Sequence, residues 1–304
     1  MVARPVPNRP FGAVLTAMVT PMSIDGSLDL DAAVALARHL VDHGHDGLVL
    51  NGTTGESPTT HAPEKAELVR AVVDAVGDRA HVIAGAGSND TAHAVRMAEN
   101  AADAGAHGLL VVSPYYSRPS QEGLVRHTLA VAESTDLPVM LYDVPGRTGV
   151  RFAPATIARL AEHDAVVAIK DATGDLYSAA TLIARTGLAW YCGDDSLYLA
   201  YLAHGAAGVV SVAGHVVGPQ LAALTQAFDA GDHARATEIL VEIAPAIDAV
   251  NAAGFQAVMA KAALELLGLV PGRTLRLPQV AATDDDVAVV RAGLVAAGLL
   301  AQSH

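Results

Sequence analysis

The chain of 304 residues has a single cysteine, Cys192, so no disulfide can form within it. Such sparse cysteine is typical of proteins from a reducing compartment. No apolar run reaches the roughly 18 residues that a membrane-spanning helix needs. The proline-rich lead, residues 1–10, lacks the apolar centre of a signal peptide. We therefore expect a cytoplasmic protein without a membrane partner.

Positive charge is also scarce, because the formal net charge is −13 and the sequence pI is about 5.3. Acidic residues are spread out, and the longest like-charged run is Asp284, Asp285 and Asp286. This distribution favours solubility and argues against a nucleic-acid partner. Hydrophobic residues make up 52% of the chain, which is enough for one large core.

Lysine is rare: the chain has only Lys65, Lys170 and Lys261, against sixteen arginines. Lys65 and Lys261 lie in helical patterns, whereas Lys170 directly follows the apolar run 165–169, which is typical of a strand buried on both faces. Lysine is seldom buried, and a desolvated amine can act as a nucleophile toward a carbonyl carbon. The alternative is a structural lysine paired with Asp171 or another acid. The residues alone leave both interpretations open.

Short apolar runs alternate along the chain with amphipathic segments, which predicts parallel strands joined by helices. We expect strands at 13–20, 47–51, 81–85, 108–113, 138–142, 165–170, 189–193 and 208–212. We expect helices at 30–43, 62–76, 91–104, 121–134, 154–162, 176–185, 196–203 and 219–230. Eight such units predict an α/β fold, a (β/α)8 barrel over residues 1–232. Residues 233–304 predict a C-terminal helical unit of two or three helices around an irregular stretch at 269–280.

Polar residues follow the predicted strands at the end where such barrels carry their active sites. Besides Lys170 they are Thr20, Thr53, Thr54, Tyr115, Tyr116, Tyr142 and Arg147. The turn 52–55 could hold a carboxylate, Tyr142 could donate a proton, and Arg147 could grip a second carboxylate. An ordinary turn, a structural tyrosine and a solvated arginine are the alternatives.

Thirteen histidines raise the question of a metal site. The densest group is His39, His43 and His45, which precedes the second strand and so falls at the wrong end of the barrel. We interpret it as a surface cluster. Asp194 and Asp195 follow the seventh strand, and we expect them to cap the next helix rather than to bind a cation. The sequence therefore predicts no metal site.

Four motifs at four strand ends together resemble the dihydrodipicolinate synthase family, within the superfamily of pyruvate aldolases and N-acetylneuraminate lyases. The motifs are Gly52-Thr-Thr-Gly-Glu56, Tyr115-Tyr116 with Arg118-Pro-Ser-Gln-Glu-Gly123, Tyr142-Asp-Val-Pro-Gly-Arg-Thr-Gly149 and Ile169-Lys-Asp-Ala-Thr-Gly174. The resemblance covers nearly the whole barrel, and the tail at 276–283 looks like the actinobacterial branch.

The resemblance implies a lyase of lysine and diaminopimelate biosynthesis that condenses pyruvate with L-aspartate 4-semialdehyde. It implies an imine between pyruvate and Lys170, with no metal or organic cofactor. Thr53, Tyr142 and a Tyr116 lent by a neighbouring subunit would form a proton relay. A homotetramer, built as a dimer of dimers, is the quaternary structure that the family implies.

The resemblance also assigns the binding residues. Thr54 and its turn would hold the carboxylate of pyruvate, and Arg147 would bind the carboxylate of the semialdehyde. Gly193 and Val210 would line the site with their backbones near pyruvate.

Two departures from the family pattern stand out. Asp143 replaces the usual asparagine after the strand-five tyrosine. The cleft that binds feedback lysine in many members would be lined here by Ser57, Ala62, Lys65, Asn89, His93 and Tyr115. Histidines are expected at the positions of Ala62 and Lys65, and a glutamate at that of His93. A site with more positive charge and one carboxylate fewer should bind lysine poorly, so we expect weak or absent inhibition.

Three alternatives remain at this stage. A related pyruvate-dependent aldolase acting on a sugar acid, like N-acetylneuraminate lyase, would share Lys170 and Tyr142, but Arg147 and the paired threonines favour the semialdehyde. A metal-dependent barrel enzyme would need ligands that the strand ends lack. A catalytically inactive barrel would not need the intact set of polar residues.

Overall fold

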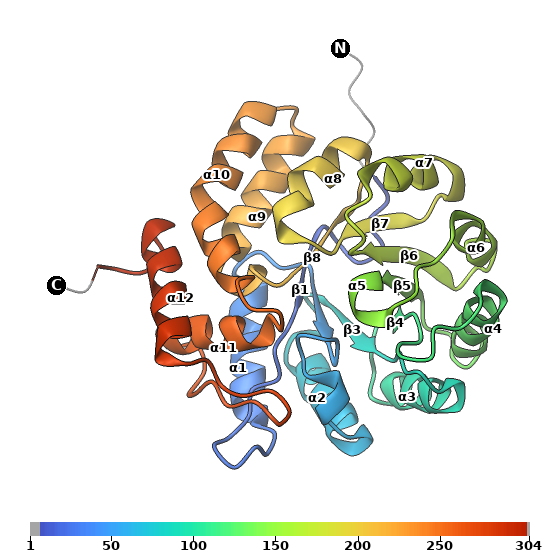
Figure 1. Cartoon of the computed structure of the whole chain (residues 1–304), viewed down its shortest axis with the longest axis horizontal. Coiled ribbons are helices and arrows are strands. Elements are labelled where there is room, and N and C mark those ends of the chain that lie inside the picture. The colour runs from blue at the N-terminus through green and yellow to red at the C-terminus, as the bar shows by residue number, and fades with distance from the viewer. Residues whose placement is uncertain (1–6, 303–304) are drawn as a thin grey trace.

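The fold is that of a computed structural model, which describes residues 7–302. Residues 1–6 lie outside the described residues, and with them most of the lead from which we predict that there is no signal peptide. Eight parallel strands close into a barrel in chain order, with β8 paired to β1 (Figure 1). The strands are β1 (Val14–Ala17), β2 (Gly47–Leu50), β3 (His81–Gly85), β4 (Gly108–Val112), β5 (Val139–Asp143), β6 (Val166–Asp171), β7 (Ala189–Cys192) and β8 (Gly208–Ser211).

Helices surround the barrel (Figure 1). Those of the eight strand–helix units are α1 (Leu30–Asp42), α2 (Ala62–Val76), α3 (Thr91–Asp103), α4 (Gln121–Ala132), α6 (Pro154–Leu160), α7 (Leu176–Thr186), α8 (Tyr198–His204) and α9 (Gly214–Asp229). The predicted (β/α)8 barrel is confirmed. No helix in the described part of the chain combines the length and apolar character needed to cross a membrane.

Three more helices follow the barrel: α10 (His233–Val250), α11 (Ala257–Leu266) and α12 (Asp284–Ala296). α10 packs against α9 and α12, and α11 packs against α12. The chain between α11 and α12 is irregular, as the sequence predicts for 269–280. The C-terminal helical extension is therefore present.

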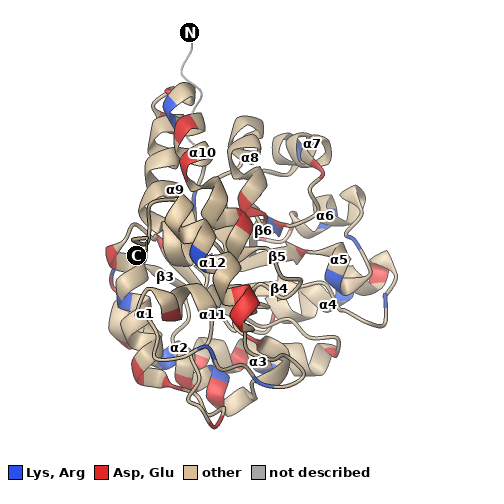
Figure 2. Cartoon of the chain, turned by 60° about the vertical axis from the view of Figure 1, so that its left-hand side comes forward, with Lys and Arg blue, Asp and Glu red and all other residues tan. Residues whose placement is uncertain are grey.

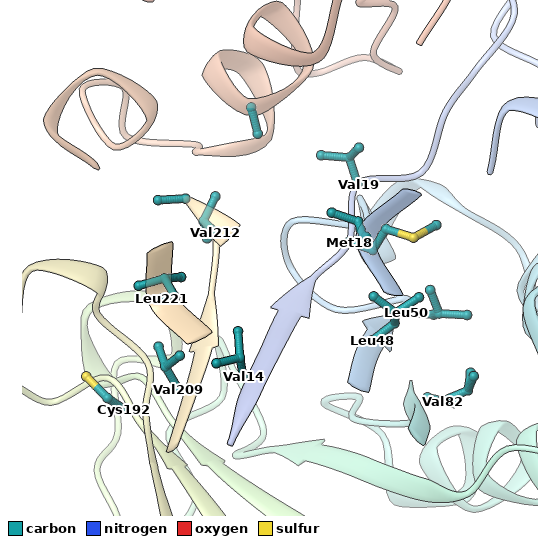
Figure 3. Packing of buried hydrophobic residues seen from close by; sticks show 14 of the residues in the cluster. Val14, Met18, Val19, Leu48, Leu50, Val82, Cys192, Val209, Val212 and Leu221 are labelled. Atoms are coloured by element: carbon teal, nitrogen blue, oxygen red, sulfur yellow. The ribbon is translucent and has the colours of Figure 1, made fainter. Parts of the chain in front are cut away.

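Side chains alternate between the two faces of each strand and form two apolar layers. The layer inside the barrel includes Leu15, Val49, Ile83, Met140, Tyr142 and Val210. The layer between the barrel and the helices includes Val14, Leu48, Val82, Cys192 and Val209 (Figure 3). Burying each large aliphatic side chain contributes about 1.5–3 kcal/mol, so the alternation fixes which strand-end residues face the barrel interior.

A bulge sets the register between β5 and β6. Val139 pairs with Val166 and Met140 pairs with Ala168. Val167 on β6 therefore has no counterpart on β5. A one-residue shift changes every later pairing. As a result, Tyr142 lies directly opposite Lys170.

The structure corrects several predicted element boundaries. β1 ends at Ala17, short of Thr20. A short helix, α5 (Pro145–Thr148), and a 3-10 turn, η1 (Ser57–Thr59), are present where no helix is predicted. The helix predicted at 196–203 is divided into a 3-10 turn, η2 (Asp195–Leu197), and α8. α9 begins at Gly214 rather than at Pro219, with a kink at Val217. Proline lacks the N–H that a helix interior needs, so it is usually found in the first turn of a helix. The predicted start of α9 at Pro219 follows that preference and falls five residues after the observed one.

Charged residues are distributed over the outer helices, where acidic and basic positions are interspersed (Figure 2). Several form ion pairs at the surface, among them Arg79 with Asp42 and Arg159 with Glu122. Exposed pairs of this kind contribute only about 0–1 kcal/mol each. The fold therefore depends on its two apolar layers rather than on surface charge.

Candidate active site

A cavity of about 530 Å³ lies at the C-terminal end of the barrel. Its wall includes Thr53, Tyr115, Tyr116, Tyr142, Arg147 and Phe255. Four residues that the sequence predicts as catalytic or binding, namely Thr53, Tyr116, Tyr142 and Arg147, are thus brought together from three different strand ends. The position agrees with the rule that such barrels build their sites from the loops after the strands.

Lys170, the last residue but one of β6, is not itself on the cavity wall but lies beside Tyr142, which is. It is 5% exposed, and its Nζ is 4.6 Å from the centroid of the Tyr142 ring. The neighbouring Asp171 faces the other way: its carboxylate accepts hydrogen bonds from Trp190 Nε1 at 2.9 Å and from the N–H of Thr173 at 2.8 Å. The alternative of a structural ion pair with Asp171 is therefore wrong.

All three lysines are buried, which the sequence did not predict for the two on helices. Lys65 Nζ donates to the carbonyls of Ser57 at 2.8 Å and Thr60 at 2.7 Å. Lys261 Nζ lies 2.5 Å from a carboxylate oxygen of Glu56 and 2.7 Å from the carbonyl of Thr274. Burial lowers the pKa of both amines, that of Lys65 to about 8. Among the lysines of residues 7–302, only Lys170 has neither a hydrogen-bond acceptor nor an ion-pair partner for its amine.

The turn after β2 is held from two sides. On the barrel side, Thr20 Oγ1 donates to the carbonyl of Gly55 at 2.7 Å. On the other side, the buried Glu56 binds Lys261 and accepts a hydrogen bond from the N–H of Arg276 at 3.0 Å. Glu56 has a φ of 56°, a left-handed conformation that a non-glycine residue adopts only when its surroundings fix it. The C-terminal segment therefore anchors the turn that carries Thr53.

Three other predicted binding residues do not line the cavity: Thr54, Gly193 and Val210. Thr54 is 3% exposed, and Val210 is fully buried in the inner layer that also contains Tyr142. Gly193 donates its N–H to the carbonyl of Asp171 at 2.7 Å. A Cβ at this position would lie 3.0 Å from both Ala172 and that carbonyl, so glycine allows the end of β7 to approach the end of β6 beside the active-site lysine.

Tyr116 is part of the cavity wall, but its side chain is 90% exposed. Its φ is 71°, in the left-handed region, and Arg118 in the same loop has a φ of 48°. Within the described residues no hydrogen bond joins the hydroxyls of Thr53, Tyr142 and Tyr116. The structure therefore brings Thr53 and Tyr142 to one wall and leaves Tyr116 projecting from the surface of the chain.

Arg147 lies on α5 and contacts the turn between α10 and α11. Its Nη2 donates to the carbonyl of Gly254 at 3.1 Å and to Oε1 of Gln256 at 2.9 Å. Arg147 is solvent-exposed, but these two contacts hold its guanidinium against the turn. Sequence reasoning missed Gln256 and Phe255, since neither belongs to a strand end and each is more than a hundred residues from Arg147 in the chain.

The two acids after β7 differ in role. Asp194 caps η2 by accepting a hydrogen bond from the N–H of Ser196 at 3.0 Å, so the capping prediction is confirmed for this residue. It is wrong for Asp195, which is buried and accepts hydrogen bonds from the N–H groups of Val212 at 3.2 Å and Ala213 at 2.9 Å. Asp195 therefore ties β7 to the end of β8.

The histidine group does not form a metal site. The rings of His39 and His43 stack with their centroids 3.9 Å apart. His45 is buried rather than on the surface, and its Nδ1 is 2.7 Å from the carbonyl of Leu40. Burial lowers the pKa of His45 to about 4. In the part of the chain that the structure describes, no three His, Cys, Asp or Glu side chains are grouped to hold a metal ion.

Comparison with known proteins agrees with this geometry. The model of the dihydrodipicolinate synthetase family matches residues 10–297. The chain belongs to that family. It is 54% identical over 293 residues to the 4-hydroxy-tetrahydrodipicolinate synthase of Kineococcus radiotolerans, covering 96% of this chain and 95% of that one. It is 55% identical over 294 residues to 4-hydroxy-tetrahydrodipicolinate synthase 2 of Streptomyces coelicolor, covering 96% and 97%.

Among solved structures, dihydrodipicolinate synthase from Cyanidioschyzon merolae with lysine bound superimposes with a TM-score of 0.93. Its sequence is 40% identical, and the match covers 96% of this chain and 100% of that one. The resemblance carried by the four motifs is confirmed, including its actinobacterial character. The chain is an enzyme, a lyase with the synthase activity of its family, and the sugar-acid alternative is not favoured.

Proposed function

We propose that this synthase condenses pyruvate with L-aspartate 4-semialdehyde through an imine on Lys170. The observation that carries the proposal is the isolation of this amine. It is buried near the end of β6, opposite Tyr142, and among residues 7–302 no acceptor or acid holds it. The other two lysines have their hydrogen-bonding capacity taken up by carbonyl or carboxylate oxygens.

In the proposed reaction the Lys170 amine attacks the ketone carbon of pyruvate, and loss of water gives the imine. The imine withdraws electrons, so C3 of pyruvate loses a proton and becomes an enamine carbon that attacks the aldehyde of the second substrate. The ring of Tyr142 lies beside the amine, and its hydroxyl would carry protons to and from it, with Thr53 on the same cavity wall as the next hydroxyl. Removing such a proton donor typically costs 10²–10⁴-fold in rate.

Both substrates carry carboxylates, and the proposal assigns one anion site to each. The turn after β2, with Thr54 and its N–H groups, would hold the carboxylate of pyruvate. Arg147 at the mouth would bind the carboxylate of the semialdehyde, because a guanidinium can donate two parallel hydrogen bonds. Gly193 and Val210 would shape the floor near pyruvate.

Quaternary structure and location are part of the proposal. Tyr116 projects from the single chain, which supports its donation to the site of a neighbouring subunit and a homotetramer arranged as a dimer of dimers. We also infer a cytoplasmic location, and an organisation into a catalytic barrel at 1–232 and a helical unit at 233–304. No metal or organic cofactor is needed for imine chemistry.

Borohydride trapping tests the nucleophile directly. The protein is incubated with pyruvate, reduced with borohydride, digested, and searched by peptide mass spectrometry for the added mass. We expect the adduct on Lys170 alone, with Lys65 and Lys261 as internal controls in the same sample. An adduct shared among the three lysines, or none at all, would remove the proposed mechanism.

A further inference from the structure

The turn at 251–256, between α10 and α11, forms part of the wall of the active-site cavity although it belongs to the C-terminal helices. Phe255 lines the cavity, and the Cζ atom of Arg147 lies 5.9 Å from the centroid of its ring. The same turn supplies both hydrogen-bond acceptors of Arg147, namely the carbonyl of Gly254 and Oε1 of Gln256. The proposed site for the second substrate is therefore assembled from α5 and this turn.

Both of these acceptors are electrically neutral, which distinguishes Arg147 from many other arginines of the chain. Eight of the described arginines lie within ion-pair distance of a carboxylate: Arg9, Arg79, Arg126, Arg151, Arg159, Arg235, Arg273 and Arg276. Arg147 has no such partner among the described residues. Its two contacts use only Nη2, so the N–H groups of Nε and Nη1 remain available to donate to a carboxylate.

The side chain of Gln256 is held in turn by a chain of hydrogen bonds that ends on the barrel. Its Nε2 donates to Oδ1 of Asn251 at 3.1 Å. Asn251 Nδ2 donates to Oδ2 of Asp195 at 3.2 Å and to the carbonyl of Ile247 at 2.9 Å. Asp195 accepts from the N–H groups at the end of β8. Arginine can only donate hydrogen bonds, so the amide oxygen of Gln256 must face the guanidinium and its amide nitrogen must face Asn251. The donor-to-acceptor order is thereby fixed along the whole series of hydrogen bonds.

From this arrangement we propose that Gln256 is a positioning and specificity-determining residue for the second substrate. It fixes the guanidinium of Arg147 at the mouth while leaving its positive charge uncompensated, so that the charge is available to the carboxylate of the semialdehyde. The inference rests on the proposed role of Arg147. It assigns to the C-terminal helices a direct part in selecting an anionic acceptor, separate from the pyruvate end of the cavity.

Replacing Gln256 with glutamate separates this role from simple structural support. Gln256→Glu keeps the shape and an acceptor oxygen for Arg147 but adds a negative charge that competes with the substrate carboxylate. We expect the KM for the semialdehyde to rise by about tenfold or more, the effect of losing one charged contact, while the KM for pyruvate changes less than about twofold. A purely structural role predicts the opposite, since a stronger hydrogen bond to Arg147 would preserve the site.

Two further variants complete the test. Gln256→Ala removes the anchor without adding charge and should raise the KM for the semialdehyde by a smaller factor, which also provides a result if the glutamate variant does not fold. Gln226→Glu, an exposed substitution on α9 with the same charge change, should leave both KM values as they are. Unchanged semialdehyde KM in both Gln256 variants would overturn the inference. Borohydride trapping on the wild-type protein distinguishes this failure from failure of the proposed function, because only the latter abolishes the pyruvate adduct on Lys170.

Discussion

Two carboxyl groups lie side by side on the outer face of β5 and β6, directly behind Tyr142 and Lys170. Asp143 follows Tyr142, Asp171 follows Lys170, and the two acids are partners across the ladder. Asp171 is satisfied by Trp190 and Thr173, whereas Oδ1 of Asp143 is buried without a hydrogen-bond partner. Burial, with the nearby Asp171 charge, raises the pKa of Asp143 to about 7, against smaller lowering effects of the Phe152 N–H and Arg151.

Asp143→Asn should therefore stabilise the protein at alkaline pH. Folding raises the pKa of Asp143, so the folded state binds its proton more tightly than the unfolded state does. The wild-type free energy of unfolding therefore has its full contribution from this proton below pH 3.8 and loses it as the pH rises through about 7. Asparagine keeps the polar contacts without the charge, and we expect a gain of roughly 1–3 kcal/mol at pH 8. The Tm of the variant relative to wild type should rise by several degrees at pH 8 and by much less at pH 5.

The exposed acid Asp136 provides the control for that experiment. Asp136→Asn should change the Tm little, and equally at both pH values. If Asp143→Asn behaves like this control, the two carboxyl groups are not coupled, and the departure from the family's asparagine has no electrostatic consequence.

For single residues, the sequence predicts a position in the site when the signal lies in the neighbouring residues of the chain. Thr53, Tyr142 and Lys170 each follow an apolar run that ends in a polar residue, so both their position and their chemistry could be predicted. The burial of Lys261 could not, since its partner Glu56 lies 205 residues away in the chain. Long-range ion pairs leave no periodic signal in a sequence.

Among the elements, α2 has an unusual relation to the turn before it. Its Lys65 points back into η1 and donates to the carbonyls of Ser57 and Thr60. We infer that this amine places a fixed cation in the cleft that the family resemblance assigns to feedback lysine, where two of the nearby carbonyl oxygens already accept its hydrogen bonds.

Free L-lysine should therefore inhibit this enzyme weakly or not at all. We expect an inhibition constant above about 1 mM, equivalent to less than about 4 kcal/mol of binding free energy, in initial-rate assays at fixed substrate concentrations. His93→Glu, an exposed change on α3, would restore an acid at the cleft and should lower that constant. Half-inhibition by submillimolar lysine in the wild-type enzyme would contradict the argument.

Element boundaries show why a periodic pattern is an incomplete guide to a site. The sequence predicted each strand within a few residues, because buried parallel strands are continuous apolar runs. It could not show the bulge opposite Val139, which decides that Tyr142 and not a neighbour faces Lys170. It also could not show α5, whose four residues are too few for a helical period.

For the molecule as a whole, we propose from the exposed Tyr116 on the β4–α4 loop that one chain does not hold a complete site. Tyr116 has 90% of its side chain exposed and a left-handed backbone. A left-handed conformation persists at a non-glycine residue only where its surroundings fix it, and within the described residues no hydrogen bond holds the Tyr116 hydroxyl. The sequence of one chain, like its fold, contains no direct signal for which neighbour receives the side chain.

Complementation between two defective subunits tests the sharing of Tyr116. Tyr116→Phe and Lys170→Arg chains should each be poorly active alone, the first because the relay loses its outer hydroxyl and the second because arginine cannot form the imine. In a hybrid dimer with Tyr116 exchanged, one site carries both defects and the other is intact. Random pairing of equal amounts should then restore about a quarter of the wild-type activity per chain. If Tyr116 instead serves its own barrel, every site retains one defect, and co-expressed, doubly tagged hybrids should be no more active than the mixed parents.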